Sequence, residues 1–260
     1  STGVSYFDFV LSGDAQEKGL TPSEVIMMTG SAGAGKTTLL LQMASMLAEQ
    51  EHTVLVIGNE ESAAQMRMTY ERLHLAGNFT IGSAYFVDMT GKKDIDDNLL
   101  PDKRKKETHN KTFMGHYDAA LEQHKAANVE RKKKGQPEKW MIVFVDSLQT
   151  LNCGKWGWKT NSNTPQRVLE RLCGLAKRDF VIMVVIGQVT KGDAFAGKNV
   201  LKHMVDGMIE LTIDKDVKSP SCGCRLLECT KHRFGPSGLT VVLDMKPKGL
   251  VEHGSFSGGV

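Results

Sequence analysis

The stretch from Gly30 to Thr38 reads G-S-A-G-A-G-K-T-T and constrains the fold more than any other part of the chain. It matches the phosphate-loop pattern of Gly, four residues, Gly, Lys and Ser or Thr. The apolar run Val25–Thr29 before it predicts a buried strand, and Leu39–Ala48 after it predicts a helix. A glycine-rich turn between such elements aims backbone N–H groups at an anion. The sequence therefore predicts a nucleotide-binding α/β fold rather than a chance glycine-rich turn.

The loop also predicts which residues bind ATP. Lys36 is expected to reach the β- and γ-phosphates, and the Thr37 hydroxyl is expected to ligate Mg²⁺. Asp146 ends the apolar run Trp140–Asp146 and is the expected acid beside the magnesium ion. The predicted metal set is therefore Thr37 and Asp146. The predicted nucleotide-binding set is Gly30, Ser31, Ala32, Gly33, Ala34, Gly35, Lys36, Thr37 and Thr38.

Further apolar runs predict the rest of a sheet within a single domain that covers residues 1–260. Thr53–Gly58 and Phe180–Gly187 have the continuous β-branched character of strands buried on both faces, which favours a mostly parallel sheet with crossover helices. The helical patterns are Ala63–Leu75 and Pro165–Lys177. Three more strands are predicted toward the C-terminus, at Gly207–Ile213, Arg225–Lys231 and Leu239–Met245.

Composition excludes few functions. A net charge of +3 is too small to indicate nucleic-acid binding by itself. We find no N-terminal apolar signal segment and no apolar run of about 18 residues, so we expect a cytoplasmic protein with no membrane contact. The five cysteines form no paired C-x-x-C groups, which argues against a disulfide framework or a structural zinc site. Cys222, Cys224, Cys229 and His232 are spaced closely enough to be metal ligands, but we interpret the cysteines as ordinary thiols.

The segment Gly91–Lys139 differs in character, with 13 Lys and Arg residues against 9 Asp and Glu residues. It predicts a charged helical insertion. The basic clusters Lys103–Lys106 and Arg131–Lys134 are either a solvated surface or an electrostatic track for a phosphate backbone. Charge counts do not separate the two interpretations.

Two polar residues are expected to act on the γ-phosphate. Glu60 and Glu61 follow the strand Thr53–Gly58 at the edge where open α/β sheets bind ligands. We predict Glu60 as the base that activates water, although both acids also suit a helix N-terminus. Gln188 follows Phe180–Gly187 and is expected to contact the γ-phosphate and signal its presence to the next loop.

Lys231 and Arg233 are predicted to complete the catalytic set. Cations at i and i+2 on an extended backbone point the same way, which suits gripping a triphosphate held by another subunit. The alternative is a surface hairpin with solvated basic side chains.

The ordered motifs of this chain resemble the RecA-fold ATPases, and most closely the bacterial RadA (Sms) family. The resemblance covers nearly the whole chain. Its motifs are D-F-V-L-S-G, the phosphate loop followed by T-L-L-L-Q, G-N-E-E-S, V-D-S-L-Q-T, G-Q-V-T-K-G-D-A-F-A-G-K-N-V-L-K-H-M-V-D and K-H-R-F-G, which is similar to the family's K-N-R-F-G.

The resemblance implies an ATP-driven ring motor, expected to be hexameric, that acts on single-stranded DNA in branch migration, with recombination or replication proteins as partners. It implies that Lys231 and Arg233 act in trans, and that the loops Asn152–Asn163 and Lys191–Val200 face the DNA. Aromatic side chains interleaved with lysines suit base stacking and phosphate contact, although Trp156 and Trp158 also suit hydrophobic packing. The implied DNA-binding residues are Lys155, Trp156, Trp158, Lys159, Lys191, Lys198 and Asn199.

The sequence departs from the family pattern in several places. It contains neither the four-cysteine zinc module nor the Lon-protease-like domain usual in the family, so functions of those parts are not implied. His232 replaces the usual Asn, and Gln188 replaces the usual His. The alternatives are a replicative-type hexameric helicase, a small-molecule kinase that uses the phosphate loop, and a nucleotide-gated scaffold that hardly hydrolyses ATP.

Overall fold

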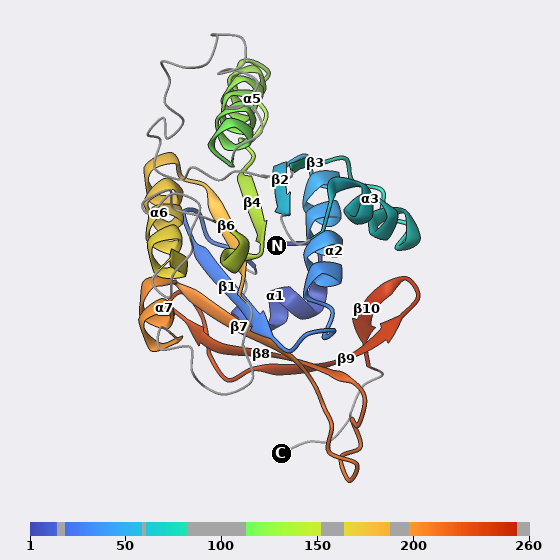
Figure 1. Ribbon diagram of the computed structural model, residues 1–260. Helices are drawn as coiled ribbons and strands as arrows, with labels where there is room; N and C mark the ends of the chain where they lie inside the picture. Colours follow the sequence, from blue (N-terminus) through green and yellow to red (C-terminus); the bar gives the residue numbers. More distant parts are fainter. Residues whose placement is uncertain (15–18, 59–60, 83–112, 152–163, 188–197, 254–260) are drawn as a thin grey trace, which may run out of the picture.

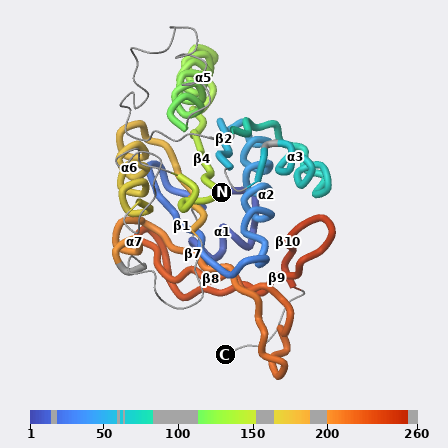
Figure 2. The backbone as a smooth tube through the Cα atoms, in the orientation of Figure 1, coloured from blue at the N-terminus to red at the C-terminus, as the bar shows by residue number. Residues whose placement is uncertain are grey.

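The structure is a computed structural model that describes residues 1–14, 19–58, 61–82, 113–151, 164–187 and 198–253 (Figure 1). One twisted sheet runs through the middle of the molecule, with helices on both of its faces (Figures 1 and 2). The phosphate-loop turn therefore sits on a rigid framework.

Nine strands of the described residues form this sheet in the order β10-β9-β8-β7-β1-β6-β4-β2-β3. The strands from β7 to β3 in this order pair in parallel, whereas β8, β9 and β10 pair antiparallel. The predicted α/β fold, with a mostly parallel sheet and a strand-rich C-terminal part, is confirmed. The strands are β1 Val25–Gly30, β2 Thr53–Gly58, β3 Thr80–Gly82, β4 Met141–Asp146, β6 Ile182–Ile186, β7 Gly207–Ile213, β8 Arg225–His232, β9 Thr240–Lys246 and β10 Gly249–Glu252.

The central strands are apolar throughout because both of their faces are covered. In β1, Ile26 and Met28 pack in one core cluster, while Val25 and Met27 pack in the cluster on the other face. This alternation is the two-residue period of a strand. The prediction misses β3 and β10, since these short edge strands have no long apolar run.

The helices divide between the two faces of the sheet (Figure 1). On one face lie α1 Ser5–Ser12, α2 Lys36–Glu49 and α3 Ala63–Arg72, and on the other lie α5 Phe113–Lys133, α6 Thr164–Asp179 and α7 Lys198–Met204. The predicted helices α2, α3 and α6 are present, whereas α1 and α7 are not in the prediction. Within the described residues, no helix is both long and apolar enough to cross a membrane.

Helix α5 lies within the predicted charged insertion, but it is not solvated along its whole length. Its first half buries Phe113, Tyr117 and Leu121 in the same core cluster as β2 and β4. Only its second half, which ends in Lys132 and Lys133, is largely exposed. The high average charge of the segment concealed the apolar stripe at its start. Residues 83–112 lie outside the described residues, so the remainder of the insertion stays a prediction.

Candidate nucleotide-binding site

Three glycines shape the turn between β1 and α2. Gly30, Gly33 and Gly35 have φ angles of 145°, 75° and 107°, values that other residues rarely adopt. Gly35 is the N-cap of α2, and no side chain among the described residues caps this helix. A helix N-terminus without a side-chain cap suits an acceptor from outside the chain, such as a phosphate. Beside Gly33 there is open space, because a Cβ there would meet no described atom within 4 Å.

Two polar side chains lie in the turn. Lys36 Nζ donates hydrogen bonds to the carbonyl oxygens of Gly30 (3.0 Å) and Ser31 (2.9 Å), which holds the ammonium group against the loop. Ser31 Oγ is buried and has no hydrogen-bond partner in the part of the chain that the structure describes. Because buried hydroxyl groups normally have a partner, Ser31 is suited to a ligand oxygen in the loop.

A third contact joins the loop helix to the centre of the sheet. Thr37 Oγ1 donates a hydrogen bond of 2.6 Å to Asp146 Oδ2. Asp146 ends β4 and is almost fully buried, with 3% of its surface exposed. A hydroxyl oxygen beside a carboxylate forms the hard-oxygen donor set that Mg²⁺ prefers. Together with the glycine cradle and the buried Ser31 hydroxyl, these residues fit a nucleotide phosphate chain with Mg²⁺.

The predicted catalytic residues Glu60 and Gln188 lie outside the described residues. Strand β2 ends at Gly58, which pairs with Asp146, so this end of β2 lies at the same sheet edge as the nucleotide site. The role of Glu60 stays a prediction. Helix α3 is capped by Ser62, whose hydroxyl accepts from Gln65 N at 3.2 Å, so Glu61 does not provide the cap.

Lys231 and Arg233 both engage the C-terminal end of α7. Lys231 Nζ donates to the carbonyl oxygens of Lys202 and Val205, each at 2.6 Å. Arg233 Nη1 forms an ion pair of 2.8 Å with Asp206 Oδ1. The two cations therefore reach the same part of the molecule, and neither is a merely solvated side chain. Burial and the neighbouring Arg233 charge lower the pKa of Lys231.

Lys231 and Arg233 lie near the amino-terminal end of β1, whereas the phosphate loop follows its carboxyl-terminal end. Asp206 Oδ2 accepts from Val25 N at the start of β1 (3.1 Å), whereas Gly30 at the end of β1 begins the loop. At about 3.3 Å per residue, the strand separates the two by about 17 Å. Arg233 therefore cannot serve the phosphate loop of its own chain in this fold.

The family model described as "ATPase: KaiC" matches residues 1–243. The chain belongs to the KaiC family of ATPases. It is also 30% identical over 253 residues to the DNA repair protein RadA of Campylobacter jejuni, which confirms the predicted resemblance to RadA. That alignment covers 96% of this chain and 45% of the relative, so the chain spans less than half of the RadA length.

Solved structures of KaiC-like and related ATPases share the fold. The KaiC-like protein PH0186 of Pyrococcus horikoshii superposes with a TM-score of 0.60 at 16% identity, covering 97% of each chain. A second solved structure, of an ATPase domain, gives a TM-score of 0.59 at 16% identity, covering 89% of this chain and 85% of that one. These similarities confirm a RecA-like phosphate-loop ATPase fold, and membership of the family supports ATP hydrolysis.

His232 has a structural role in this KaiC-family core. Its Nε2 lies 2.6 Å from Glu24 Oε1, and its Nδ1 lies 2.8 Å from the carbonyl oxygen of Leu11. Since both ring nitrogens face acceptors, this geometry favours the doubly protonated imidazole. Burial opposes this charge, but the hydrogen bond and charge of Glu24, the Leu11 carbonyl and the charge of Asp206 together raise the pKa of His232.

The predicted DNA-binding residues lie mostly outside the described residues of the KaiC-family core. This holds for Lys155, Trp156, Trp158, Lys159 and Lys191. Lys198 and Asn199 begin α7, but the structure does not describe their side chains. The DNA contacts of all seven residues stay predictions.

Sequence reasoning missed the residues that hold the cationic group in place. Asp206 bridges Arg233 and β1, and Glu24 pairs with His232 across 208 positions of sequence. The sequence contained one indication of a role for Asp206, since this acidic residue directly precedes the predicted strand Gly207–Ile213. Nothing in the local pattern around Glu24 indicates its partner, because strand pairing alone brings them together.

Proposed function

We propose that this chain is the ATPase core of a RadA-like ring motor that hydrolyses ATP and moves along or remodels single-stranded DNA. One observation carries the proposal: Arg233 lies at the sheet edge opposite Lys36, too far to act on its own loop. A nucleotide held at a seam between two copies brings both residues to one triphosphate. The similarity to proteins named for DNA repair supports DNA as the partner.

Within one copy, the loop N–H groups and Lys36 would bind and orient the phosphates. Thr37 and Asp146 would hold Mg²⁺, which when bound neutralises phosphate charge. We assign Glu60 to orient and deprotonate the attacking water, and Gln188 to contact the γ-phosphate. The protein's contribution to such a reaction is mainly positioning and charge stabilisation.

The next copy would contribute Arg233 and Lys231. Their charges would stabilise the negative charge that develops on the transferred phosphoryl group. Arg233 would have to exchange Asp206 for phosphate, and its side chain is 48% exposed, so it is accessible to a neighbouring copy. Lys231 is more enclosed by α7 and would support Arg233 by position and charge.

The DNA would pass through the ring, which we propose to be a hexamer. The proposed contacts are Lys155, Trp156, Trp158, Lys159, Lys191, Lys198 and Asn199. Stacking and phosphate contact of this type bind single strands with little sequence preference. Recombination or replication proteins are the proposed partners of the complete assembly.

A subunit-mixing experiment tests the shared site. Arg233→Ala and Lys36→Ala are each expected to lose DNA-stimulated ATP hydrolysis by about 10³-fold, the typical contribution of an arginine supplied in trans. When the two variants are mixed, seams that combine an intact loop with an intact Arg233 form again. We therefore expect the mixture to recover a substantial fraction of wild-type activity, with single-stranded DNA present.

Two further measurements complete the test. Arg233→Ala alone should bind a fluorescent ATP analogue nearly as well as wild type, because its own loop is unchanged. Molecular mass in solution should rise with the analogue and an oligonucleotide. An inactive mixture would contradict the shared site. A monomer whose rate of ATP turnover is unchanged by DNA would favour a small-molecule kinase instead.

A further inference from the structure

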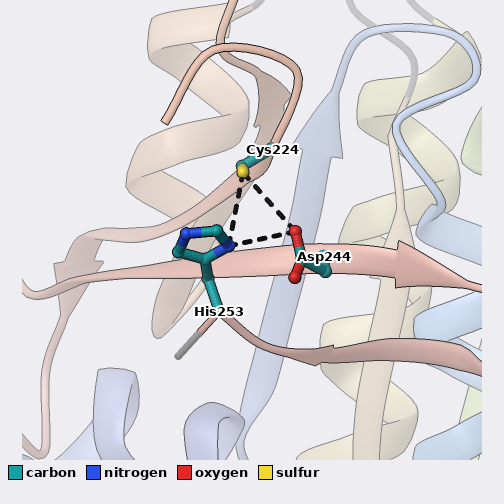
Figure 3. A group of neighbouring side chains, drawn as sticks. All are labelled: Cys224, Asp244 and His253. Carbon is teal, nitrogen blue, oxygen red and sulfur yellow. Dashed lines mark hydrogen bonds and ion pairs between the residues drawn. The ribbon is translucent and has the colours of Figure 1, made fainter. Parts of the chain in front are cut away.

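Three side chains of types that can ligate a metal ion meet in the antiparallel part of the sheet (Figure 3). Cys224 directly precedes β8, Asp244 lies in β9, and His253 directly follows β10. These three strands are consecutive neighbours in the sheet. The strand pairing therefore brings together a sulfur, an oxygen and a nitrogen that are up to 29 positions apart in sequence.

The spacing of the three ligand atoms suits a tetrahedral ion. Cys224 Sγ lies 3.5 Å from Asp244 Oδ1 and 3.6 Å from His253 Nδ1, and that nitrogen lies 3.0 Å from Oδ1. With Zn–S of about 2.3 Å and Zn–N and Zn–O of about 2.0 Å, a tetrahedral centre needs about 3.5 Å from sulfur to either atom and about 3.3 Å from nitrogen to oxygen. The observed triangle is within a few tenths of an ångström of this.

The geometry differs from that of a nucleophilic relay. In a Cys-His-Asp relay, the acid and the thiol contact opposite nitrogens of the imidazole ring. Here, Cys224 and Asp244 both contact His253 Nδ1 (Figure 3). The three atoms therefore form one compact triangle within reach of a single ion.

The surroundings hold the three side chains in this arrangement and leave it accessible. Backbone hydrogen bonds fix two of them: Asp214 N donates to Cys224 O at 3.0 Å, and His253 N donates to Val242 O at 2.9 Å. Lys246 Nζ lies 3.3 Å from the second oxygen of Asp244, which leaves Oδ1 for the ion. The His253 side chain is 31% exposed, so an ion and a water ligand have a path from solvent.

We propose that Cys224, Asp244 and His253 form a zinc site, with water as the fourth ligand. A thiolate and an imidazole favour Zn²⁺ over Mg²⁺, so the site is distinct in chemistry from Thr37 and Asp146. On binding, the Cys224 thiol releases its proton to solvent, and the thiolate, the imidazole nitrogen and one carboxylate oxygen coordinate the ion. The ion would join β8, β9 and β10.

Cobalt replaces zinc as a coloured probe. Co²⁺ titrated into the purified chain should give a near-ultraviolet thiolate-to-metal charge-transfer band that saturates at one ion per chain, and Zn²⁺ should displace it. Loss of an outer-shell partner alone weakens metal binding by about 10- to 100-fold, so Cys224→Ser should lose the band and weaken binding by more than about 100-fold. His253→Gln should retain the thiolate but weaken binding similarly.

Cys222→Ser is the matched control, since Cys222 is an exposed thiol two positions away in the same turn. This variant should keep the full band. Circular dichroism of each variant checks its folding, and Zn²⁺ should raise the melting temperature of wild type and Cys222→Ser only. A band that survives Cys224→Ser, a band lost in Cys222→Ser, or no band in the wild type would each overturn the proposal.

Discussion

Charged side chains lie at both ends of the central strand β1. The two ends differ in how much of a binding site a single chain provides there. At the carboxyl edge of β1, Thr37 and Asp146 already contact each other, and the Ser31 hydroxyl is buried without a partner in the described part of the chain. At the amino-terminal end of β1, Arg233 pairs with Asp206, and Lys231 donates to the carbonyl oxygens of Lys202 and Val205.

The difference suggests that two copies of the chain contribute different groups to one site. One edge has open space beside Gly33 and a buried hydroxyl suited to a ligand, as substrate sites usually do. At the other end, the cations are held in intramolecular contacts, and in the proposed shared site a second copy would displace Arg233 from Asp206. Substitutions at both ends of β1 test this contrast.

Among these variants, replacement of Lys36 is expected to lower ATP hydrolysis the most. We expect Lys36→Ala to reduce ATP hydrolysis by about 10³-fold or more, because it removes a cation that lies against the loop and would stabilise phosphate charge. Steady-state ATPase rates with single-stranded DNA measure this. Lys215→Ala, at an exposed position after β7, should leave the rate unchanged, and an equal defect there would mean that the loss is general.

The hydroxyl of Thr37 is the next test of this edge. Thr37→Ala should lower hydrolysis by about 100-fold, as loss of one oriented polar group in an active site typically does. Thr37→Ser keeps the hydroxyl beside Asp146 and should remain close to wild type. The measurement is ATPase rate against Mg²⁺ concentration. Equal defects in the Ser and Ala variants would show that the hydroxyl is not what matters.

At the opposite edge, His232 predicts a pH-dependent stability. Its pKa in the folded protein is raised above the ordinary 6.5 because the contacts with Glu24 outweigh burial. The added stability is therefore complete below about pH 6.5, where the unfolded imidazole is also charged, and it is lost as pH rises through the folded-state pKa. A charged hydrogen bond of this kind contributes about 1.5–3 kcal/mol.

His232→Asn, which restores the residue usual in the RadA motif, is the matched variant for this test. Urea unfolding of both proteins between about pH 6 and pH 9 measures the difference in free energy of unfolding. We expect wild type to exceed the variant most at the acidic end, with the gap narrowing as pH rises. A gap that is constant, or that widens with pH, would contradict a charged His232.

The smallest effect concerns the backbone of the loop. Gly33 and Gly135 both have positive φ angles, 75° and 67°, and a Cβ would meet no described atom within 4 Å at either position. Each change to Ala should therefore lower the free energy of unfolding by about 1 kcal/mol through backbone strain alone. Only Gly33→Ala should also weaken binding of an ATP analogue. Equal binding by the two variants would show that phosphate does not approach Gly33.

How much of this could be read from the sequence depends on whether the relevant residues are neighbours in the chain. The buried strands of the parallel part were predictable because coverage of both faces demands continuous apolar runs, as in Val25–Met28. The apolar stripe of α5 was hidden by the charges between its buried positions. The pairing of His232 with Glu24 and the meeting of Cys224, Asp244 and His253 depend on strand order, which local patterns do not encode.

The phosphate loop could be recognised from the sequence alone, because its function needs consecutive residues: glycines for the turn, then Lys36 and Thr37 at the start of a helix. The sequence also indicated that Lys231 and Arg233 point the same way, since side chains alternate along a strand. The position of that pair in the molecule follows from strand order, which local patterns do not show. The register of β8 on β7, and of β7 on β1, places Arg233 at the opposite end of β1 from Lys36, so the length of β1 keeps Arg233 away from the phosphate loop of its own chain.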